Sequence, residues 1–248
     1  MSRGGGARRA RREQVDPVRA SAFSSALRAW FRKHGRSLPW RETRDPYRVL
    51  VSEAMLQQTQ VSRVVDYYAR FLERFPTLDA LARARPRQVR ESWEGLGYYA
   101  RARNLHALSR AVTSLPSDPA ELRRLPGVGA YTAGAVASFA FERRAALVDT
   151  NVARVLRRVF APRANFKTAR GQQRLWALAE QVLPRTGKLA WTHNQAIMEL
   201  GAMICTARIA RCERCPVILS CRSGKGEMGT ANRNGGKGEK GKGGGKEP

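Results

Sequence analysis

The chain lacks any long hydrophobic segment. No apolar run in its 248 residues approaches the roughly 18–20 residues that a helix needs to cross a bilayer. The Gly- and Arg-rich N-terminus also lacks the apolar stretch of a secretory signal. These absences argue against a secreted protein and against one with membrane-spanning helices. We therefore expect an intracellular protein that does not contact a membrane.

Acidic residues are scarce relative to basic ones. The sequence has 20 Asp and Glu against 46 Lys and Arg, which gives a formal net charge of +26. Such an excess repels itself unless a polyanion or an anionic membrane surface is the usual neighbour, and nucleic acid is the leading candidate partner. The hydrophobic content of 42% is nevertheless sufficient for a buried core.

Cysteine is confined to one short stretch. Cys205, Cys212, Cys215 and Cys221 follow the spacing C-x6-C-x2-C-x5-C, and no other cysteine occurs. In a reducing compartment this clustering favours metal ligation over disulfides. Four thiolates can hold either a zinc ion or an iron–sulfur cluster. Structural zinc usually uses two short cysteine pairs, whereas only Cys212 and Cys215 form such a pair here.

Alternating strand patterns are also missing, and the apolar residues recur at helical spacing. Two examples are Phe23, Leu27, Trp30 and Phe31, and Val152, Val155, Leu156 and Val159. The Asp45-Pro46 and Asp118-Pro119 pairs are typical helix starts. The sequence therefore predicts an all-α fold. Residues 1–14 and 223–248 are rich in Gly and charge, so we expect a disordered basic arm and a disordered Gly/Lys tail that either solubilise the protein or tether it to DNA.

A glycine-containing turn follows Leu125-Pro126. Gly127, Val128 and Gly129 separate a short helical segment from an Ala-rich helix predicted over 130–140. Glycines permit positive φ, and they let a phosphate approach backbone N–H groups at the positive end of the next helix. Such a hairpin can grip a DNA backbone without reading its sequence. An ordinary tight turn is the alternative.

Two carboxylates stand out from their surroundings. If Pro46 opens a helix, Glu53 shares a face with Val49 and Leu50, so a charge lies in an apolar stripe. Burial would raise the pKa of Glu53, as a general acid requires, although a buried and hydrogen-bonded Glu would look the same in sequence. Asp149 precedes a predicted helix and fits a helix N-cap, but it could also stabilise a cation electrostatically.

Several motifs resemble those of the MutY family of helix-hairpin-helix DNA glycosylases. The similarity covers 38–221, roughly three quarters of the chain, and the cysteine spacing is similar to the iron–sulfur loop of endonuclease III and MutY glycosylases. The matching stretches are LPWR (38–41), SEAMLQQTQV (52–61), GLGYYARARNLH (95–106), LPGVGAYTAGA (125–135), VDTNVARVL (148–156) and NQAIMELGAMICT (194–206).

The resemblance implies a role for each matching residue. Glu53 would protonate the leaving adenine and then direct water, and Asp149, supported by Asn151, would stabilise or transiently capture the sugar cation. Tyr131 takes the position of the lysine nucleophile of bifunctional relatives, and a phenol cannot form a Schiff base. The DNA-contacting positions would be Trp40, Arg41 and Gln195 near the adenine, Gln57 and Gln58 at the lesion, Tyr98 as a wedge, and Gly127, Val128 and Gly129 in the hairpin. Trp40 and Tyr98 could alternatively be core aromatics.

The resemblance also implies the architecture. We expect two lobes: a six-helix barrel with the hairpin (38–143), and a lobe of 15–37 with 144–222 whose four cysteines hold a [4Fe–4S] cluster. The Nudix-like domain that usually follows in the family is not expected here.

The expected activity is monofunctional excision of adenine opposite guanine or 8-oxoguanine, by a monomer acting on mismatched double-stranded DNA. A thymine/guanine mismatch glycosylase of the same superfamily is the first alternative. A catalytically silent DNA-binding module is the second, and the presence of Glu53 and Asp149 argues against it.

Overall fold

The structure is a computed structural model that describes residues 14–224. The arm predicted at 1–14 and the tail predicted at 223–248 lie outside the described residues, apart from residues 14, 223 and 224. The described part is all-α, as the sequence predicted, and eleven α-helices and three short 3-10 helices lie wholly within it. Within the described range, no helix combines the length and hydrophobicity needed to cross a membrane.

The helices follow one another with short connections. In chain order they are α2 (Pro17–His34), η1 (Pro39–Arg41), α3 (Pro46–Leu56), α4 (Val61–Arg74), α5 (Leu78–Arg83), α6 (Pro86–Ser92), α7 (Ala100–Ala111), α8 (Pro119–Leu122), α9 (Ala130–Phe141), α10 (Thr150–Phe160), α11 (Ala169–Val182), α12 (Gly187–Met203), η2 (Cys212–Arg214) and η3 (Ile218–Ser220).

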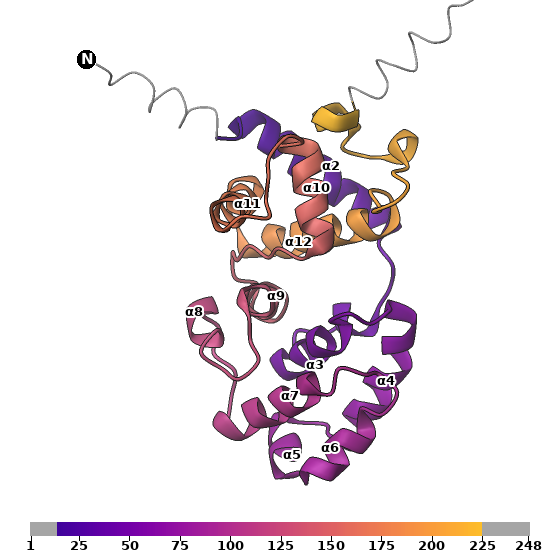
Figure 1. Ribbon diagram of the computed structural model, residues 1–248, viewed down its shortest axis with the longest axis vertical. Coiled ribbons are helices and arrows are strands. Elements are labelled where there is room, and N and C mark those ends of the chain that lie inside the picture. Colours follow the sequence, from indigo (N-terminus) through magenta and orange to yellow (C-terminus); the bar gives the residue numbers. More distant parts are fainter. Residues whose placement is uncertain (1–13, 225–248) are drawn as a thin grey trace, which may run out of the picture.

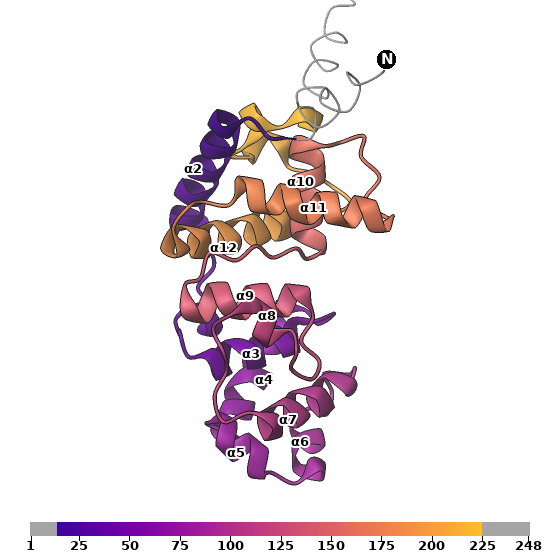
Figure 2. The same ribbon diagram turned by 90° about the vertical axis from the view of Figure 1, so that its left-hand side faces the viewer.

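The helices gather into two lobes, one above the other in Figure 1. The upper lobe consists of α2, α10, α11, α12 and the segment with η2 and η3, and the lower lobe consists of α3 to α9 (Figure 2). Helix α9 packs on α12 and so joins the two lobes. The first helix of the described chain therefore lies with the last ones. The domain boundaries given above stay predictions.

Helix α2 is held in the upper lobe by its apolar face. Phe23 and Leu27 are fully buried, as the helical spacing predicted. The Phe23 ring meets the Phe160 ring of α10 edge-on, with centroids 5.1 Å apart, and it lies 5.9 Å from the His193 ring of α12. Burying a large apolar side chain contributes roughly 1.5–3 kcal/mol, so these contacts fix α2 across both helices.

Helix α3 is the central helix of the lower lobe. It begins as predicted, because the Asp45 side chain accepts a hydrogen bond from the backbone N–H of Arg48 at 3.0 Å and Pro46 occupies the first turn. The helix packs on α4, α7 and α9. Every side chain from Val49 to Met55 is buried as a result, including that of Glu53.

The predicted hairpin joins α8 to α9. The Asp118 side chain caps α8 by accepting hydrogen bonds from the backbone N–H groups of Ala120 and Glu121. Only one of the two glycines has the backbone conformation that the sequence suggested: Gly127 has φ +74°, whereas Gly129 has φ −85° and caps α9. A Cβ at Gly127 would collide with the side chain of Asn104, but nothing lies within 4 Å of one at Gly129.

Candidate active site

A cleft of about 710 Å³ lies between the two lobes. Its walls come from η1, α3 and α9 on one side and from α11, α12 and the start of α10 on the other. The structure therefore brings together residues that are far apart in the sequence. The predicted site residues that line the cleft are Trp40, Arg41, Glu53, Gln57, Gln58, Tyr131, Asp149, Asn151 and Gln195.

Glu53 is buried on α3 and faces this cleft. Glu53 is 3% exposed, and its Oε2 atom has no hydrogen-bond partner among the described residues. Burial raises the pKa of Glu53 to about 7, and the negative charge of Asp149 acts in the same direction. A hydrogen bond with Tyr131 and the charge of Arg41 oppose the rise. A substantial fraction of Glu53 is therefore protonated at neutral pH.

Asp149 caps α10 and lines the cleft at the same time. Its side chain accepts a hydrogen bond from the backbone N–H of Val152 at 2.6 Å and another from Nδ2 of Asn151 at 3.0 Å. Burial raises the pKa of Asp149, while these two hydrogen bonds oppose the rise because they favour the ionised form. The helix-cap interpretation is confirmed, and it leaves the carboxylate in the cleft wall.

The approach of Asp149 to α9 depends on a glycine. The segment 145–148 that leads to Asp149 runs against α9, where a Cβ on Gly134 would collide with the carbonyl oxygen of Ala146.

Tyr131 lies on the first turn of α9, and its hydroxyl is 4.0 Å from Sδ of Met198. Burial and the nearby Glu53 raise the pKa of Tyr131 well above its usual value. The hydroxyl is therefore neutral, and it offers no amine.

A hydrogen-bond chain runs from Asp149 to the cysteine-containing segment. Arg154 donates to Oδ1 of Asn151 at 2.6 Å and to the carbonyl oxygen of Cys205 at 2.7 Å. The amide of Asn151 is thereby fixed, with its oxygen accepting from Arg154 and its nitrogen donating to Asp149. Two side chains, Asn151 and Arg154, thus link Asp149 to the backbone of the first cysteine.

Sequence reasoning missed the ion-pair network behind Gln195. Arg41 donates to Oε1 of Gln195 at 2.8 Å and to Oε2 of Glu199 at 2.8 Å, and Arg36 pairs with Glu199 at 2.7 Å. Burial alone would raise the pKa of Glu199, but the hydrogen bonds from Arg36 and Arg41 outweigh it and lower the pKa to about 2. The only signal in the sequence is that Gln195 and Glu199 are four residues apart on one helix, so they share a face.

Trp40 and Tyr98 behave differently from each other. Trp40 is 7% exposed and meets the Tyr68 ring edge-on at 5.5 Å, so it is a core aromatic that also lines the cleft. Tyr98 lies outside the cleft lining and is 59% exposed, with φ +48°. The core interpretation is therefore wrong for Tyr98.

The hairpin residues Gly127, Val128 and Gly129 also lie outside the cleft lining. The Val128 side chain is buried, so this residue can offer a ligand only its backbone.

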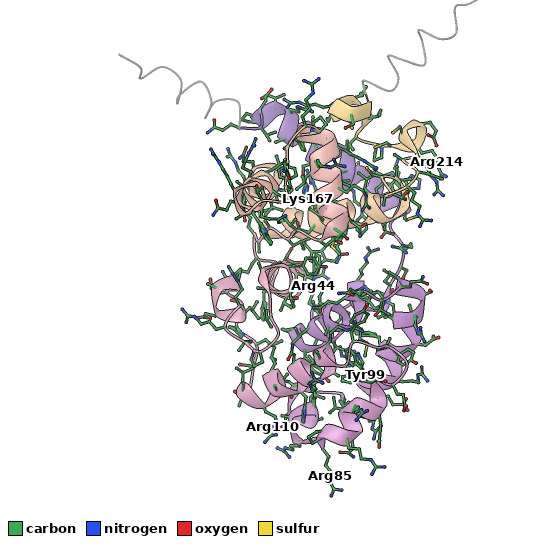
Figure 3. The ribbon with its side chains drawn as sticks, viewed as in Figure 1. Arg44, Arg85, Tyr99, Arg110, Lys167 and Arg214 are labelled. Atoms are coloured by element: carbon green, nitrogen blue, oxygen red, sulfur yellow. The ribbon has the colours of Figure 1, made fainter. Side chains whose placement is uncertain are left out.

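The four cysteines surround a second cavity, of about 350 Å³. Arg158 donates to Sγ of Cys205 at 3.3 Å, and the backbone N–H of Gly224 donates to Sγ of Cys221 at 3.3 Å. Four thiols around one cavity, with donors directed at two of the sulfurs, fit a thiolate-bound cluster. In the described residues, no three His, Cys, Asp or Glu side chains converge closely enough to hold a single ion. Arg214, between two of the cysteines, lies at the edge of the upper lobe (Figure 3).

The fold is all-α, with a helix-hairpin-helix element in the lower lobe and a cleft between the two lobes. The family described as "HhH-GPD superfamily base excision DNA repair protein" matches residues 51–181, and the chain belongs to this family.

Two curated relatives and one solved structure extend the comparison. The adenine DNA glycosylase of Homo sapiens is 43% identical over 224 residues, which cover 84% of this chain and 40% of the human protein. That of Mycolicibacterium smegmatis is 42% identical over 202 residues, covering 79% and 67% respectively. The chain thus spans less than half of the human relative's length. A thermostable thymine-DNA glycosylase structure superposes with a TM-score of 0.77 at 29% identity, covering 84% of this chain and 98% of that one.

Proposed function

We propose that the protein hydrolyses the N-glycosidic bond of adenine mispaired with guanine or 8-oxoguanine in double-stranded DNA. The observation that carries the proposal is Glu53, a buried carboxyl with a pKa of about 7 and an unpartnered oxygen in the wall of a large cleft. General acids of this kind are typical of glycosidic cleavage. The similarity to adenine DNA glycosylases supports adenine as the base.

The chemistry divides between two carboxyls. Glu53 donates its proton to the departing adenine, and the resulting carboxylate directs a water molecule to the sugar. Asp149, which Asn151 orients, stabilises the positive charge that develops on the sugar. Because Tyr131 has no amine, no Schiff base forms, and the enzyme leaves an abasic site in an intact strand.

The DNA is held by elements at the mouth of the cleft and beside it. The adenine must leave the base stack to reach Glu53, and Trp40, Arg41 and Gln195 then surround it. Tyr98 enters the stack as a wedge, and Gln57 and Gln58 contact the lesion. The backbone of Gly127, Val128 and Gly129 at the positive end of α9 binds phosphate.

The four cysteines would hold a [4Fe–4S] cluster, and such a cluster would link the two ends of the loop from Cys205 to Cys221. The cluster supplies no group to the hydrolysis, which the cleft residues perform. Purified protein should therefore be brown and contain about four iron atoms per chain with little zinc. Colourless, zinc-loaded protein with full excision activity would contradict the assignment.

An excision assay with Glu53→Gln tests the proposed reaction. Wild-type protein should release adenine from A:G and A:8-oxoguanine duplexes and leave the strand intact until alkali is added. Glu53→Gln should lower excision by at least roughly 10²–10⁴-fold, the effect of losing acid–base catalysis, while mismatch binding persists. Glu73→Gln, which changes an exposed glutamate of α4, serves as the matched control and should have no effect. Normal excision by Glu53→Gln would overturn the mechanism.

Thymine excision is the second candidate function. It is favoured by the superposition on nearly the whole of a thymine-DNA glycosylase. Including T:G and U:G duplexes in the same assay decides between the two bases.

A further inference from the structure

The guanidinium group of Arg101 connects two turns of the lower lobe. Arg101 lies on α7 and is 9% exposed. Within the described part of the chain it forms no ion pair, and the acceptors of its hydrogen bonds are backbone carbonyls. Three acceptors lie at the C-terminal end of α3: the carbonyls of Ala54 (3.0 Å), Met55 (2.7 Å) and Gln57 (2.6 Å). The other three lie in the turn before α7: the carbonyls of Leu96 (3.3 Å), Gly97 (3.0 Å) and Tyr98 (3.4 Å).

Both turns contain a residue in a conformation that side chains rarely adopt. Gln58 has φ +57° and Tyr98 has φ +48°, and the described residues contain only one other non-glycine residue with positive φ, Glu142. Such conformations cost free energy and persist only where the surroundings impose them. Arg101 binds the carbonyl of Gln57, the residue directly before Gln58, and it also binds the carbonyl of Tyr98. One side chain therefore holds both strained turns.

The chemistry of the contact requires arginine. A guanidinium presents five donors in a rigid planar fork, whereas a lysine ammonium has three donors at a single point. The guanidinium also lies over two aromatic rings, since its carbon is 5.4 Å from the centroid of the Trp93 ring and 5.6 Å from that of Tyr98. Trp93 itself donates to the Gly97 carbonyl at 3.2 Å.

The hairpin adjoins the same group. Gly127 and Val128 line a small hollow together with Arg101 and Gln57. The two turns that Arg101 binds and the hairpin beside it, which all contact DNA under the proposed function, therefore lie close to this one guanidinium.

We propose that Arg101 is a positioning residue that locks the Gln57–Gln58 turn and the Tyr98 turn together, so that the wedge and the mouth of the cleft open the duplex as one unit. The proposal rests on the proposed function, because it assigns both turns to DNA. If Arg101 merely stabilised the end of α3, its replacement would lower the melting temperature without altering base opening in the folded protein.

The test uses the full-length chain in a Glu53→Gln background, which prevents excision. The probe is a duplex in which 2-aminopurine replaces the mispaired adenine, because its fluorescence rises when the base leaves the stack. Adding Arg101→Lys should abolish most of this rise and lower the preference for mismatched over matched duplex by roughly tenfold, within the range of coupled contacts. Affinity for matched duplex should stay within about twofold, since the hairpin supplies it through phosphates. Arg110→Lys, on the same helix and at the far end of the lower lobe (Figure 3), should change neither.

Tyr98→Ala completes the test. It should cause the same loss as Arg101→Lys, and the two changes together should cause no further loss. Additive losses in the double variant would overturn the inference. So would an unchanged fluorescence rise after Arg101→Lys, provided that the Glu53→Gln parent itself opens the mispaired base. A parent that opens no mismatched base overturns the proposed function, and the inference with it.

A second cycle covers the case in which Arg101→Lys does not fold. With Arg101 intact, Gln58→Ala and Tyr98→Ala should reduce mismatch preference non-additively, because the two turns act as one unit. Additive losses in this cycle would show that the turns work independently and would overturn the inference.

Discussion

At the scale of single residues, the raised pKa of Glu53 makes folding stability depend on pH. Its pKa is about 7 in the folded protein against an ordinary value of 4.5. Between these values the folded state binds more protons than the unfolded state, so this residue's contribution to stability falls as pH rises. It is fully favourable below about pH 4.5, and the loss is complete above about pH 7.

Glu53→Gln should therefore gain stability relative to wild type as the pH rises. The difference in unfolding free energy between variant and wild type should grow by roughly 3 kcal/mol between pH 4 and pH 8.5. Urea unfolding at the two pH values measures it. A difference that does not change with pH would mean that Glu53 titrates at its ordinary value.

Individual residues were predictable from sequence where the signal is local. The burial of Glu53 followed from the apolar neighbours on its own helix, and the Asp149 cap followed from its place before a helix. Arg101 and Glu199 were not found, because the α3 carbonyls that Arg101 binds and the arginines that Glu199 pairs with lie 44–47 and 158–163 residues away along the chain. No spacing rule encodes such pairs, which exist only after the helices have packed.

At the scale of elements, the two hairpin glycines should respond differently to alanine. Gly127→Ala should destabilise the fold by roughly 1–3 kcal/mol, because φ is positive and the new Cβ meets Asn104. Gly129→Ala has open space and an ordinary φ, so the melting temperature should not change. If phosphate approaches this backbone, Gly129→Ala should still weaken duplex binding. Unchanged binding would place the phosphate elsewhere.

The helices themselves were the most predictable elements. Asp45 and Asp118 mark starts that the structure confirms. The helical spacing of apolar residues matches the buried face of α10 in full, whereas in α2 it matches Phe23 and Leu27, and Trp30 and Phe31 are only partly buried. The turn conformations were less predictable: glycine permits a positive φ at both hairpin positions, but the chain uses it only at Gly127. Gln58 and Tyr98 adopt it without being glycine, because tertiary contacts impose the conformation.

At the scale of the whole molecule, the positive charge should make DNA binding strongly dependent on salt. No acidic residue occurs between Asp149 and Glu180. Lys167 and Arg170 lie there and form no ion pair with an acidic residue of the described chain, and nearby Gln172 lines the cleft. Replacing both cations by Gln should reduce the slope of log affinity against log salt by about 2, since each phosphate contact contributes about 0.9.

The matched control replaces Arg85 and Arg110 by Gln. Both lie at the far end of the lower lobe in Figure 3, so this pair should leave the slope unchanged. If the wild type and both double variants had the same slope, the α11 region would not be part of the DNA-binding surface.

The packing of α2 against α12 also sets an order of events during synthesis. A ribosome makes α2 first, but its partner α12 begins only at Gly187. At about 5–20 residues per second, the apolar face of α2 waits on the order of ten seconds or more before that partner emerges. The lower lobe, by contrast, is complete once α9 has been made, so it can fold while the nascent chain is still being extended. Until α10, α11 and α12 have been made, α2 cannot form these contacts, and in that interval its apolar face is exposed to chaperones and to aggregation.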